Sequence, residues 1–146
     1  GSMELLVMRH GDAEDSKDDF HRRLTSLGRD EARDAALAIA DRDFKPEVIY
    51  ASPLKRAQET AGIVAEHLRM DVVECDSITP SGSCQHVCEL LSKAKAERPL
   101  IVSHQPFVSL MIHFLTGEQI FMNTGALCMV RIDVFGRDLG ELIWTQ

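Results

Sequence analysis

Short apolar runs recur along the chain and are separated by stretches with helical periodicity. Residues 5–8, 48–51 and 100–102 form the clearest runs, and residues 72–73 form a shorter one. Runs of this length are too short for helices and predict buried strands. Buried strands that alternate with helices are typical of a mostly parallel sheet that is covered by helices on both faces.

The stretches between these runs carry apolar residues three and four positions apart, as one face of a helix requires. Thr25 is placed to cap the first helix. Pro53 is expected at the first helical position of the second helix, where its missing N–H would be unpaired in any case. The apolar positions of the four expected helices are Ala32, Ala35, Ala36, Ile39 and Ala40; Ala57, Ala61, Val64, Ala65 and Leu68; Val87, Leu90, Leu91 and Ala94; and Phe107, Leu110, Met111 and Phe114.

The C-terminal segment has a different pattern, because residues 130–134 alternate between apolar and polar side chains. Alternation predicts a half-exposed strand, which we expect to be antiparallel and to pair with residues 142–144 across a turn at 136–140. The predicted fold class is therefore α/β, with a three-layer α/β/α arrangement and a mostly parallel sheet that has an antiparallel C-terminal edge. No linker or repeat divides the chain, so residues 3–146 are expected to form a single domain. Gly1 and Ser2 are interpreted as the remnant of a removed tag.

The charge balance argues against one large class of partners. The chain has 23 acidic and 16 basic residues and a formal net charge of −7. Nucleic-acid-binding proteins normally carry a basic surplus, so we expect no nucleic-acid partner. The run of carboxylates at residues 12–19 is expected to be an exposed loop, although it could instead recruit a basic face on a partner.

The cysteines and the apolar segments indicate the compartment. Cys75, Cys84, Cys88 and Cys128 show neither a CxxC motif nor zinc-ligand spacing, and we interpret them as free thiols. The sequence shows no signal peptide and no apolar run long enough to span a bilayer. A cytoplasmic protein without a membrane partner is therefore expected.

Polar residues of a matching kind follow three of the predicted strands. Arg9-His10-Gly11 follows the first strand, Ser52-Pro53 the second, with Arg56 close behind, and Ser103-His104 the fourth. Sites in open α/β sheets form beyond the carboxyl ends of the strands, so these three segments can converge.

Two histidines with two or more arginines fit phosphoryl transfer. Guanidinium groups present planar forks that match phosphate oxygens and stay charged at working pH. A neutral imidazole nitrogen can attack phosphorus and hold the group as phosphohistidine. Gly11 would let the chain turn tightly beside the phosphate.

These segments, including "SPLKRAQET" and "IVSHQP", resemble the histidine phosphatase superfamily, which has the phosphoglycerate-mutase-like fold. Within that superfamily the chain looks most like the small phosphohistidine phosphatases of the SixA type, on the evidence of "RHGDA", "RRLTSLG", "SITPSG" and its short length. The resemblance implies that His10 is the nucleophile and that Arg9 and Arg56 clamp the phosphate. It also implies that His104 binds a phosphate oxygen, and that Arg22, or else Arg23, makes a further contact.

The substrate is expected to be a phosphoramidate. Larger members of the superfamily place a carboxylate opposite the nucleophile to protonate an alkoxide leaving group, and Asp76 is the nearest candidate here. An imidazole, with a pKa of about 6.5, leaves with less help from an acid. We therefore expect a histidine-phosphorylated protein as partner, from a phosphorelay or a phosphotransferase system. Neither a cofactor nor a metal is expected, and the chain is expected to be a monomer.

Other functions stay open on the sequence alone. One is a small-molecule phosphomonoesterase of the same superfamily, and another is a catalytically silent phosphate-binding module. A metal-dependent hydrolase could use His10 and Asp12 as ligands, although the nearby arginines would repel a cation. A mutase is a further alternative, but the short chain leaves little room to retain and reorient an intermediate.

Overall fold

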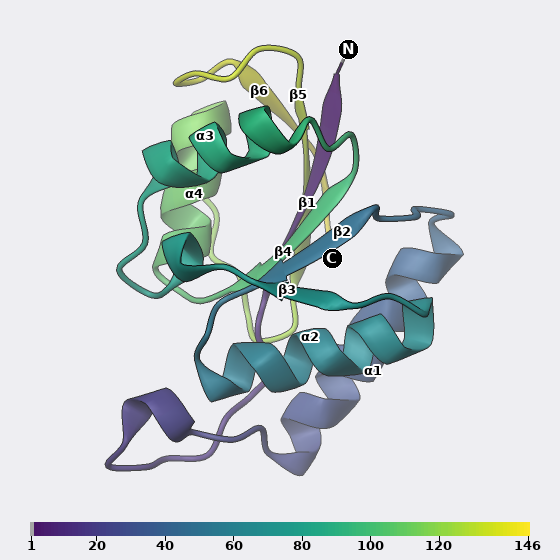
Figure 1. Ribbon diagram of the computed structural model, residues 1–146, viewed down its shortest axis with the longest axis vertical. Coiled ribbons are helices and arrows are strands. Elements are labelled where there is room, and N and C mark those ends of the chain that lie inside the picture. The colour runs from purple at the N-terminus through teal and green to yellow at the C-terminus, as the bar shows by residue number, and fades with distance from the viewer. Residues whose placement is uncertain (1) are drawn as a thin grey trace.

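The computed structural model describes residues 2–146 (Figure 1). Its strands are β1 (Met3–Arg9), β2 (Val48–Ala51), β3 (Val72–Glu74), β4 (Pro99–Ser103), β5 (Leu127–Ile132) and β6 (Gly140–Thr145). Its helices are α1 (Ser26–Asp41), α2 (Lys55–Leu68), α3 (Cys84–Ala94) and α4 (Phe107–Thr116), and two short 3-10 turns are η1 (Asp19–His21) and η2 (Asp76–Ile78). The strands and helices predicted from the sequence are all present.

Within the described chain the strands form one sheet in the order β3-β2-β4-β1-β5-β6. β3, β2, β4 and β1 run parallel, whereas β5 runs antiparallel to both β1 and β6. The predicted sheet, mostly parallel with an antiparallel C-terminal edge, is therefore confirmed. This order places β4 between β1 and β2, so the ends of these three strands lie next to one another.

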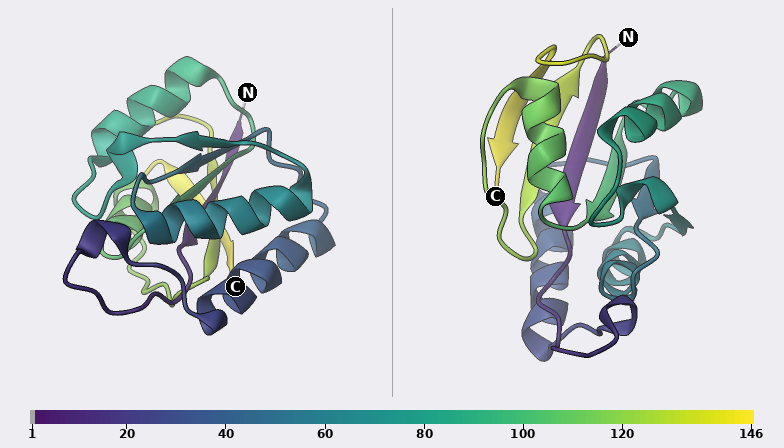
Figure 2. Two further views of the ribbon diagram at one scale, coloured as in Figure 1. Left: turned by 60° about the horizontal axis from the view of Figure 1, so that its bottom comes forward. Right: turned by 90° about the vertical axis from the view of Figure 1, so that its left-hand side faces the viewer.

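The continuous apolar run of β1 follows from burial on both faces of the sheet. Leu5 and Val7 belong to the core that α3 and α4 cover, whereas Leu6 and Met8 belong to the core under α1 and α2. The two helix pairs lie on opposite sides of the sheet (Figure 2). A strand that is covered on both faces cannot carry polar residues on either one, which explains the pattern.

The start of α2 differs from the prediction. The helix begins at Lys55, with Leu54 at its N-cap, two residues after the proline that was expected to open it. The N–H of Ser52 still donates to the carbonyl of Val102 on β4 at 3.1 Å, and its side chain accepts from the Leu54 N–H at 3.3 Å. Pro53 therefore lies in the turn between β2 and α2, and the prediction of its helical position was wrong.

β5 differs from the half-exposed strand that was expected. Apart from Arg131 its residues are buried, because β5 pairs with β1 on one side and β6 on the other and contributes to both cores. Val134 lies beyond the strand and is exposed. The half-exposed edge strand is β6, on which exposed and partly buried residues mix.

The described residues also bear on the cysteines, membranes and metals. All four cysteines are unpaired, and three of them are buried. None of the helices between residues 2 and 146 combines the length and apolar character that a membrane span needs. In the same part of the chain, no three His, Cys, Asp or Glu side chains are grouped as metal ligands would be.

Candidate active site

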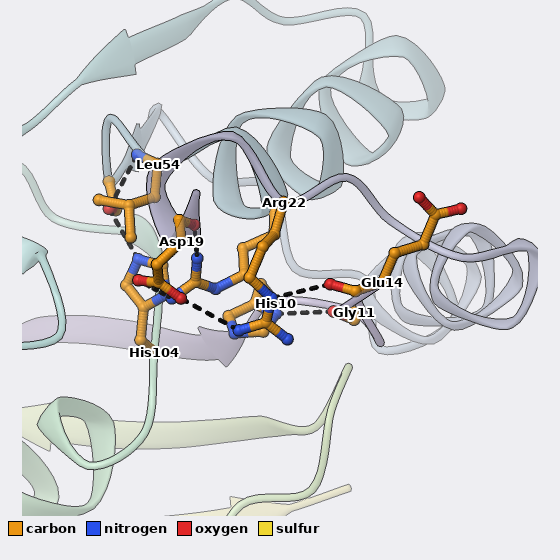
Figure 3. A network of polar contacts seen from close by, with 9 residues as sticks. His10, Gly11, Glu14, Asp19, Arg22, Leu54 and His104 are labelled. Atoms are coloured by element: carbon orange, nitrogen blue, oxygen red, sulfur yellow. Dashed lines mark hydrogen bonds and ion pairs between the residues drawn. The ribbon is translucent and has the colours of Figure 1, made fainter. Parts of the chain in front are cut away.

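The carboxyl ends of β1, β2 and β4 bring together polar residues from distant parts of the chain. The N–H of His10 donates to the carbonyl of Ser103 at 2.9 Å, which joins the residues that follow β1 and end β4. The ring centroids of His10 and His104 lie 5.0 Å apart, and both side chains are buried (Figure 3). The convergence expected from the strand order is thus present in the fold.

The imidazole of His10 is held by a single hydrogen bond to the neighbouring residue. Its Nδ1 lies 2.6 Å from the carbonyl oxygen of Gly11 (Figure 3). Because a carbonyl can only accept a hydrogen bond, Nδ1 must carry the proton. In the neutral ring the other nitrogen, Nε2, then has a free lone pair, which is the state that a nucleophile requires.

The surroundings of His10 keep its ring neutral. Burial, together with the charges of Arg56, Arg9 and Arg22, lowers its pKa to about 4 against the opposing effect of the Gly11 hydrogen bond. Burial and neighbouring cations both disfavour the protonated form. The lone pair on Nε2 is therefore available at neutral pH.

Arg9, which is partly buried, and Arg56, which is buried, supply cations with unused donors. Arg9 donates through Nη1 to the carbonyl of Met122 at 3.0 Å, and Arg56 donates through Nη1 to the carbonyl of Asp19 at 2.8 Å. The Nε atoms of both arginines are buried and have no partner within the described chain. Burial lowers the pKa of both guanidinium groups, which nevertheless remain charged at working pH. Unused donors on two cations suit an anionic ligand.

The imidazole of His104 has a hydrogen-bond partner at one ring nitrogen and none at the other among the described residues. Its Nε2 lies 2.7 Å from the hydroxyl of Ser52, whereas its Nδ1 is buried without a partner among the described residues. Burial, with added effects of His10 and Arg56, lowers the pKa of His104 to about 2. If the Ser52 hydroxyl donates to Nε2, the neutral ring carries its proton on Nδ1 and has one N–H left for a ligand.

The structure distinguishes between Arg22 and Arg23. Arg22 is partly buried, donates through Nε to the carbonyl of Glu14 at 2.8 Å, and lies close enough to His10 for its charge to lower the histidine pKa. Arg23 is exposed and pairs with Glu59. Of the two alternatives, the structure brings Arg22 to the site and directs Arg23 toward α2.

Asp19 was not among the predicted site residues, because the run of carboxylates at residues 12–19 was expected to be an exposed loop. Its carboxylate lies 3.2 Å from Nη1 of Arg22 and 3.5 Å from Nη2 of Arg56, and it points toward the two histidines (Figure 3). The loop that precedes α1 therefore folds back over the end of β1 and places an anion between two arginines. No periodic pattern in residues 12–19 signals this contact, because long-range partners determine it.

Gly11 has a different structural role from the one expected. A Cβ atom at Gly11 would lie 2.4 Å from the carbonyl oxygen of Gly28, and one at Gly28 would lie 2.0 Å from the carbonyl oxygen of Asp12. Gly28 is in the first turn of α1, where its N–H donates to the predicted cap, Thr25, at 3.0 Å. The two glycines thus allow β1 and α1 to approach closely, which positions His10.

Asp76, the candidate acid, lies apart from this network of contacts. It is exposed at the start of η2 and makes no hydrogen bond or ion pair within the described residues. The same turn is tied to the site through Ile78, whose carbonyl accepts from the hydroxyl of Ser103 at 2.6 Å. The structure therefore brings η2 to the edge of the site but does not bring the Asp76 carboxylate into contact with the histidines or arginines.

Comparison with known proteins gives consistent matches. The model of the histidine phosphatase superfamily (branch 1) matches residues 5–79. Phosphohistidine phosphatase SixA of Escherichia coli (strain K12) is 32% identical over 152 residues, which cover 99% of this chain and 93% of that protein. The structure of the protein histidine phosphatase SixA complexed with tungstate has a TM-score of 0.89 and 28% identity, with 99% of this chain and 96% of that one covered. A phosphoserine phosphatase mutant from Entamoeba histolytica in complex with phosphoserine shares the fold, with a TM-score of 0.77 and 16% identity over 98% of this chain and 96% of that one.

Proposed function

The chain belongs to the histidine phosphatase superfamily, and on that premise we propose that it removes the phosphoryl group from histidine-phosphorylated proteins through a covalent intermediate on His10. The observation that carries this proposal is the hydrogen bond from Nδ1 of His10 to the carbonyl of Gly11 at 2.6 Å. It leaves an unprotonated Nε2 beside the charges of Arg9 and Arg56. Similarity to a phosphohistidine phosphatase over 99% of the chain supports the same function.

In the first step, the lone pair on Nε2 of His10 attacks phosphorus while the P–N bond to the substrate imidazole breaks. The electron pair of that bond stays on the substrate nitrogen. When the other nitrogen of the substrate ring is protonated, the leaving group is a neutral imidazole and no proton has to move. His10 keeps its Nδ1 proton, so the phosphorylated ring of the enzyme has the same charge as the substrate ring that it replaces.

The arginines and His104 act by position and charge. Arg9 and Arg56 clamp the phosphoryl oxygens with donors that include the unpaired Nε atoms, and Arg22 adds a third guanidinium. His104 donates from Nδ1 to a phosphoryl oxygen. The transition state of phosphoryl transfer spreads negative charge over these oxygens, so fixed donors and cations in a buried site lower its free energy.

In the second step, water attacks the phosphorus held on His10. The P–N bond breaks, its electron pair returns to Nε2, and both protons of the water leave with the phosphate. His10 is restored with its proton on Nδ1. The hydrogen bond to Gly11 holds the same tautomer before, during and after the cycle.

The chemistry of the leaving group selects phosphohistidine over a phosphate ester. An alkoxide is strongly basic and leaves poorly unless an acid protonates it, whereas an imidazole with a pKa of about 6.5 leaves without that help. Asp76 is exposed and outside the contacts of the site. The carboxylate of Asp19 contacts Arg22 and Arg56, so its partners are two arginines of the site.

The alternative function is that of a small-molecule phosphomonoesterase. The same fold occurs in a phosphoserine phosphatase, so the fold by itself admits an ester substrate. In that case Asp76, which begins the turn at the edge of the site, would have to reach the leaving oxygen.

Four further properties belong to this proposal. The reaction is metal-independent, because the three arginines around His10 disfavour a cation. Residues 3–146 act as one histidine phosphatase domain and work as a monomer. The unpaired cysteines are typical of a reducing compartment, which supports a cytoplasmic location.

Substrate comparison tests the proposal. Proteins phosphorylated on histidine, aspartate or serine are offered to the wild-type protein and to His10→Ala as control. We expect kcat/KM on the phosphohistidine protein to exceed that on the phosphoserine protein by at least about 100-fold, which is the contribution of a missing general acid. Comparable rates on phosphoserine and phosphohistidine contradict the proposal and favour the phosphomonoesterase.

A further inference from the structure

Both exposed phenylalanines of the described chain border the proposed active site. Phe121 is 70% exposed, and its ring centroid lies 5.8 Å from the guanidinium carbon of Arg9. Phe20 is 46% exposed and follows Asp19, whose backbone carbonyl accepts from Arg56. Two separate loops thus present an aromatic ring to solvent beside the arginines of one site.

An apolar cavity lies beside α4 and the residues that precede Phe121. Its volume is about 220 Å³, and its lining residues are Pro106, Ser109, Leu110, His113, Gln119 and Ile120. The cavity is lined by Pro106, two residues after His104 in the chain, and by Ile120, which directly precedes Phe121. Leu110 stands at its rim and is 57% exposed.

We infer that Phe20, Phe121 and Leu110, together with the cavity beside α4, form the surface that docks the phosphohistidine-bearing protein; this inference rests on the proposed function. We call these three residues the apolar rim. Single exposed apolar side chains are ordinary, but apolar side chains gathered around a site mark a contact with a partner. Exposed aromatic rings are also enriched where proteins meet.

The charges outside the apolar rim indicate a protein with a basic surface. On the two loops that carry the phenylalanines, exposed carboxylates outnumber exposed cations: Glu14, Asp15, Asp18 and Glu118 against Lys17 and Arg23. The side chain of Glu14 points away from His10, out of the site (Figure 3). Carboxylates around a cationic pocket repel a small free anion that approaches from solution, but they attract a lysine- or arginine-rich surface that delivers a phosphohistidine. The occupant is therefore a protein whose phosphohistidine lies in an apolar patch edged by basic residues.

The test compares a protein substrate with a small one. The protein substrate is a histone phosphorylated chemically on histidine, and the small substrate is the free amino acid phosphohistidine. Phe20→Ser and Leu110→Ser are measured beside the matched control Leu37→Ser, which removes an equally exposed leucine (56%) from α1. Phe121 is left intact because it contacts Arg9.

We expect Phe20→Ser and Leu110→Ser each to lower kcat/KM on the phosphorylated histone by about tenfold, as the loss of an interface anchor does. Their kcat/KM on free phosphohistidine should stay at the wild-type value, and Leu37→Ser should change neither. Unchanged turnover of the histone by both variants overturns the docking surface and leaves the proposed function standing. An equal loss of kcat/KM on the histone and on free phosphohistidine also overturns the docking surface. A wild-type protein that hydrolyses neither substrate overturns the proposed function and this inference with it.

A second pair of variants tests the charge. Asp15→Lys reverses one exposed carboxylate on the loop that carries Phe20, and Asp34→Lys makes the same change on the exposed side of α1. We expect Asp15→Lys to lower kcat/KM on the basic histone several-fold and Asp34→Lys to leave it unchanged, because the interaction between exposed charges decays with distance. Equal effects of the two variants contradict a partner with a basic surface.

Discussion

The hydroxyl of Ser52 lies 2.7 Å from Nε2 of His104, and both side chains are buried at the junction of β2 and β4. The direction of this hydrogen bond determines which ring nitrogen of neutral His104 carries the proton. When the hydroxyl donates to Nε2, the proton resides on Nδ1, the atom that has no partner in the described chain. Ser52 would then act as a positioning residue for a donor that faces the phosphoryl group.

Ser52→Ala should therefore weaken catalysis through His104. We expect kcat/KM on a phosphohistidine protein to fall about three- to tenfold, the value of one hydrogen bond. A double-mutant cycle provides the control: in a His104→Ala background, Ser52→Ala should have no further effect. Additive losses would show that Ser52 acts independently of His104.

Arg22 and Arg23, which are neighbours in the sequence, provide a matched pair of variants. Arg22 lies near His10, whereas Arg23 pairs with Glu59 on the surface. Arg22→Ala should lower kcat/KM by at least about tenfold, as expected for a hydrogen bond to a charged group. Arg23→Ala should change kcat/KM by less than about twofold, because exposed ion pairs contribute little. A larger loss in Arg23→Ala than in Arg22→Ala would reverse the assignment.

The lowered pKa of His10 predicts two effects of pH. The nucleophile is the neutral ring of His10. Protonation of His10 should therefore not lower kcat/KM as the pH falls through 6.5, and should lower it only near the His10 pKa of about 4. Between these values the unfolded state binds a proton on this residue that the folded state does not. The free energy of unfolding should therefore decrease as the pH is lowered from about 6.5 toward about 4.

Urea unfolding at several pH values measures the second effect. His10→Gln removes the titrating group, so this variant should show a weaker dependence of the unfolding free energy on pH than the wild-type protein. An equal slope in both proteins would mean that the pKa of His10 is not lowered by the fold.

Alanine substitutions of Gly28 and Gly62 should have opposite effects on stability, because only Gly28 lies at the close approach of β1 and α1. Gly28→Ala places a Cβ about 2.0 Å from the carbonyl of Asp12 and should destabilise the protein by about 3 kcal/mol or more. Gly62 lies in α2 with nothing near its Cβ position, so Gly62→Ala should stabilise it by up to about 1 kcal/mol. Urea unfolding of both variants tests this, and a mild effect of Gly28→Ala would contradict the packing described.

The residues whose convergence the sequence predicted share a local cause. His10 and His104 each directly follow the last residue of a strand, and the ends of parallel neighbouring strands must meet. The apolar runs and helical spacings likewise depend on nearby residues only. For these features a short window of sequence contains enough information.

The features that were missed depend on long-range contacts. Asp19 reaches the site because residues 12–25 fold back, through an isolated bridge between Ala13 and Leu24 and a hydrogen bond from Thr25 to Asp12. β5 is buried because of its pairing with β6, which its own alternating pattern did not reveal. The choice between Arg22 and Arg23 likewise required knowledge of which side of the loop faces His10.

The central claim is that His10 carries the phosphoryl group covalently, and rapid quenching of a single turnover tests it most directly. A histone labelled with radioactive phosphate on histidine is mixed with excess enzyme, quenched in alkali, and the labelled enzyme residue is located by mass spectrometry. We predict an alkali-stable, acid-labile label on His10, and in His10→Ala no label and a turnover reduced by about 1,000-fold or more, the scale for loss of a nucleophile. A label on another residue, or turnover in His10→Ala equal to that of the wild-type protein, would contradict the account.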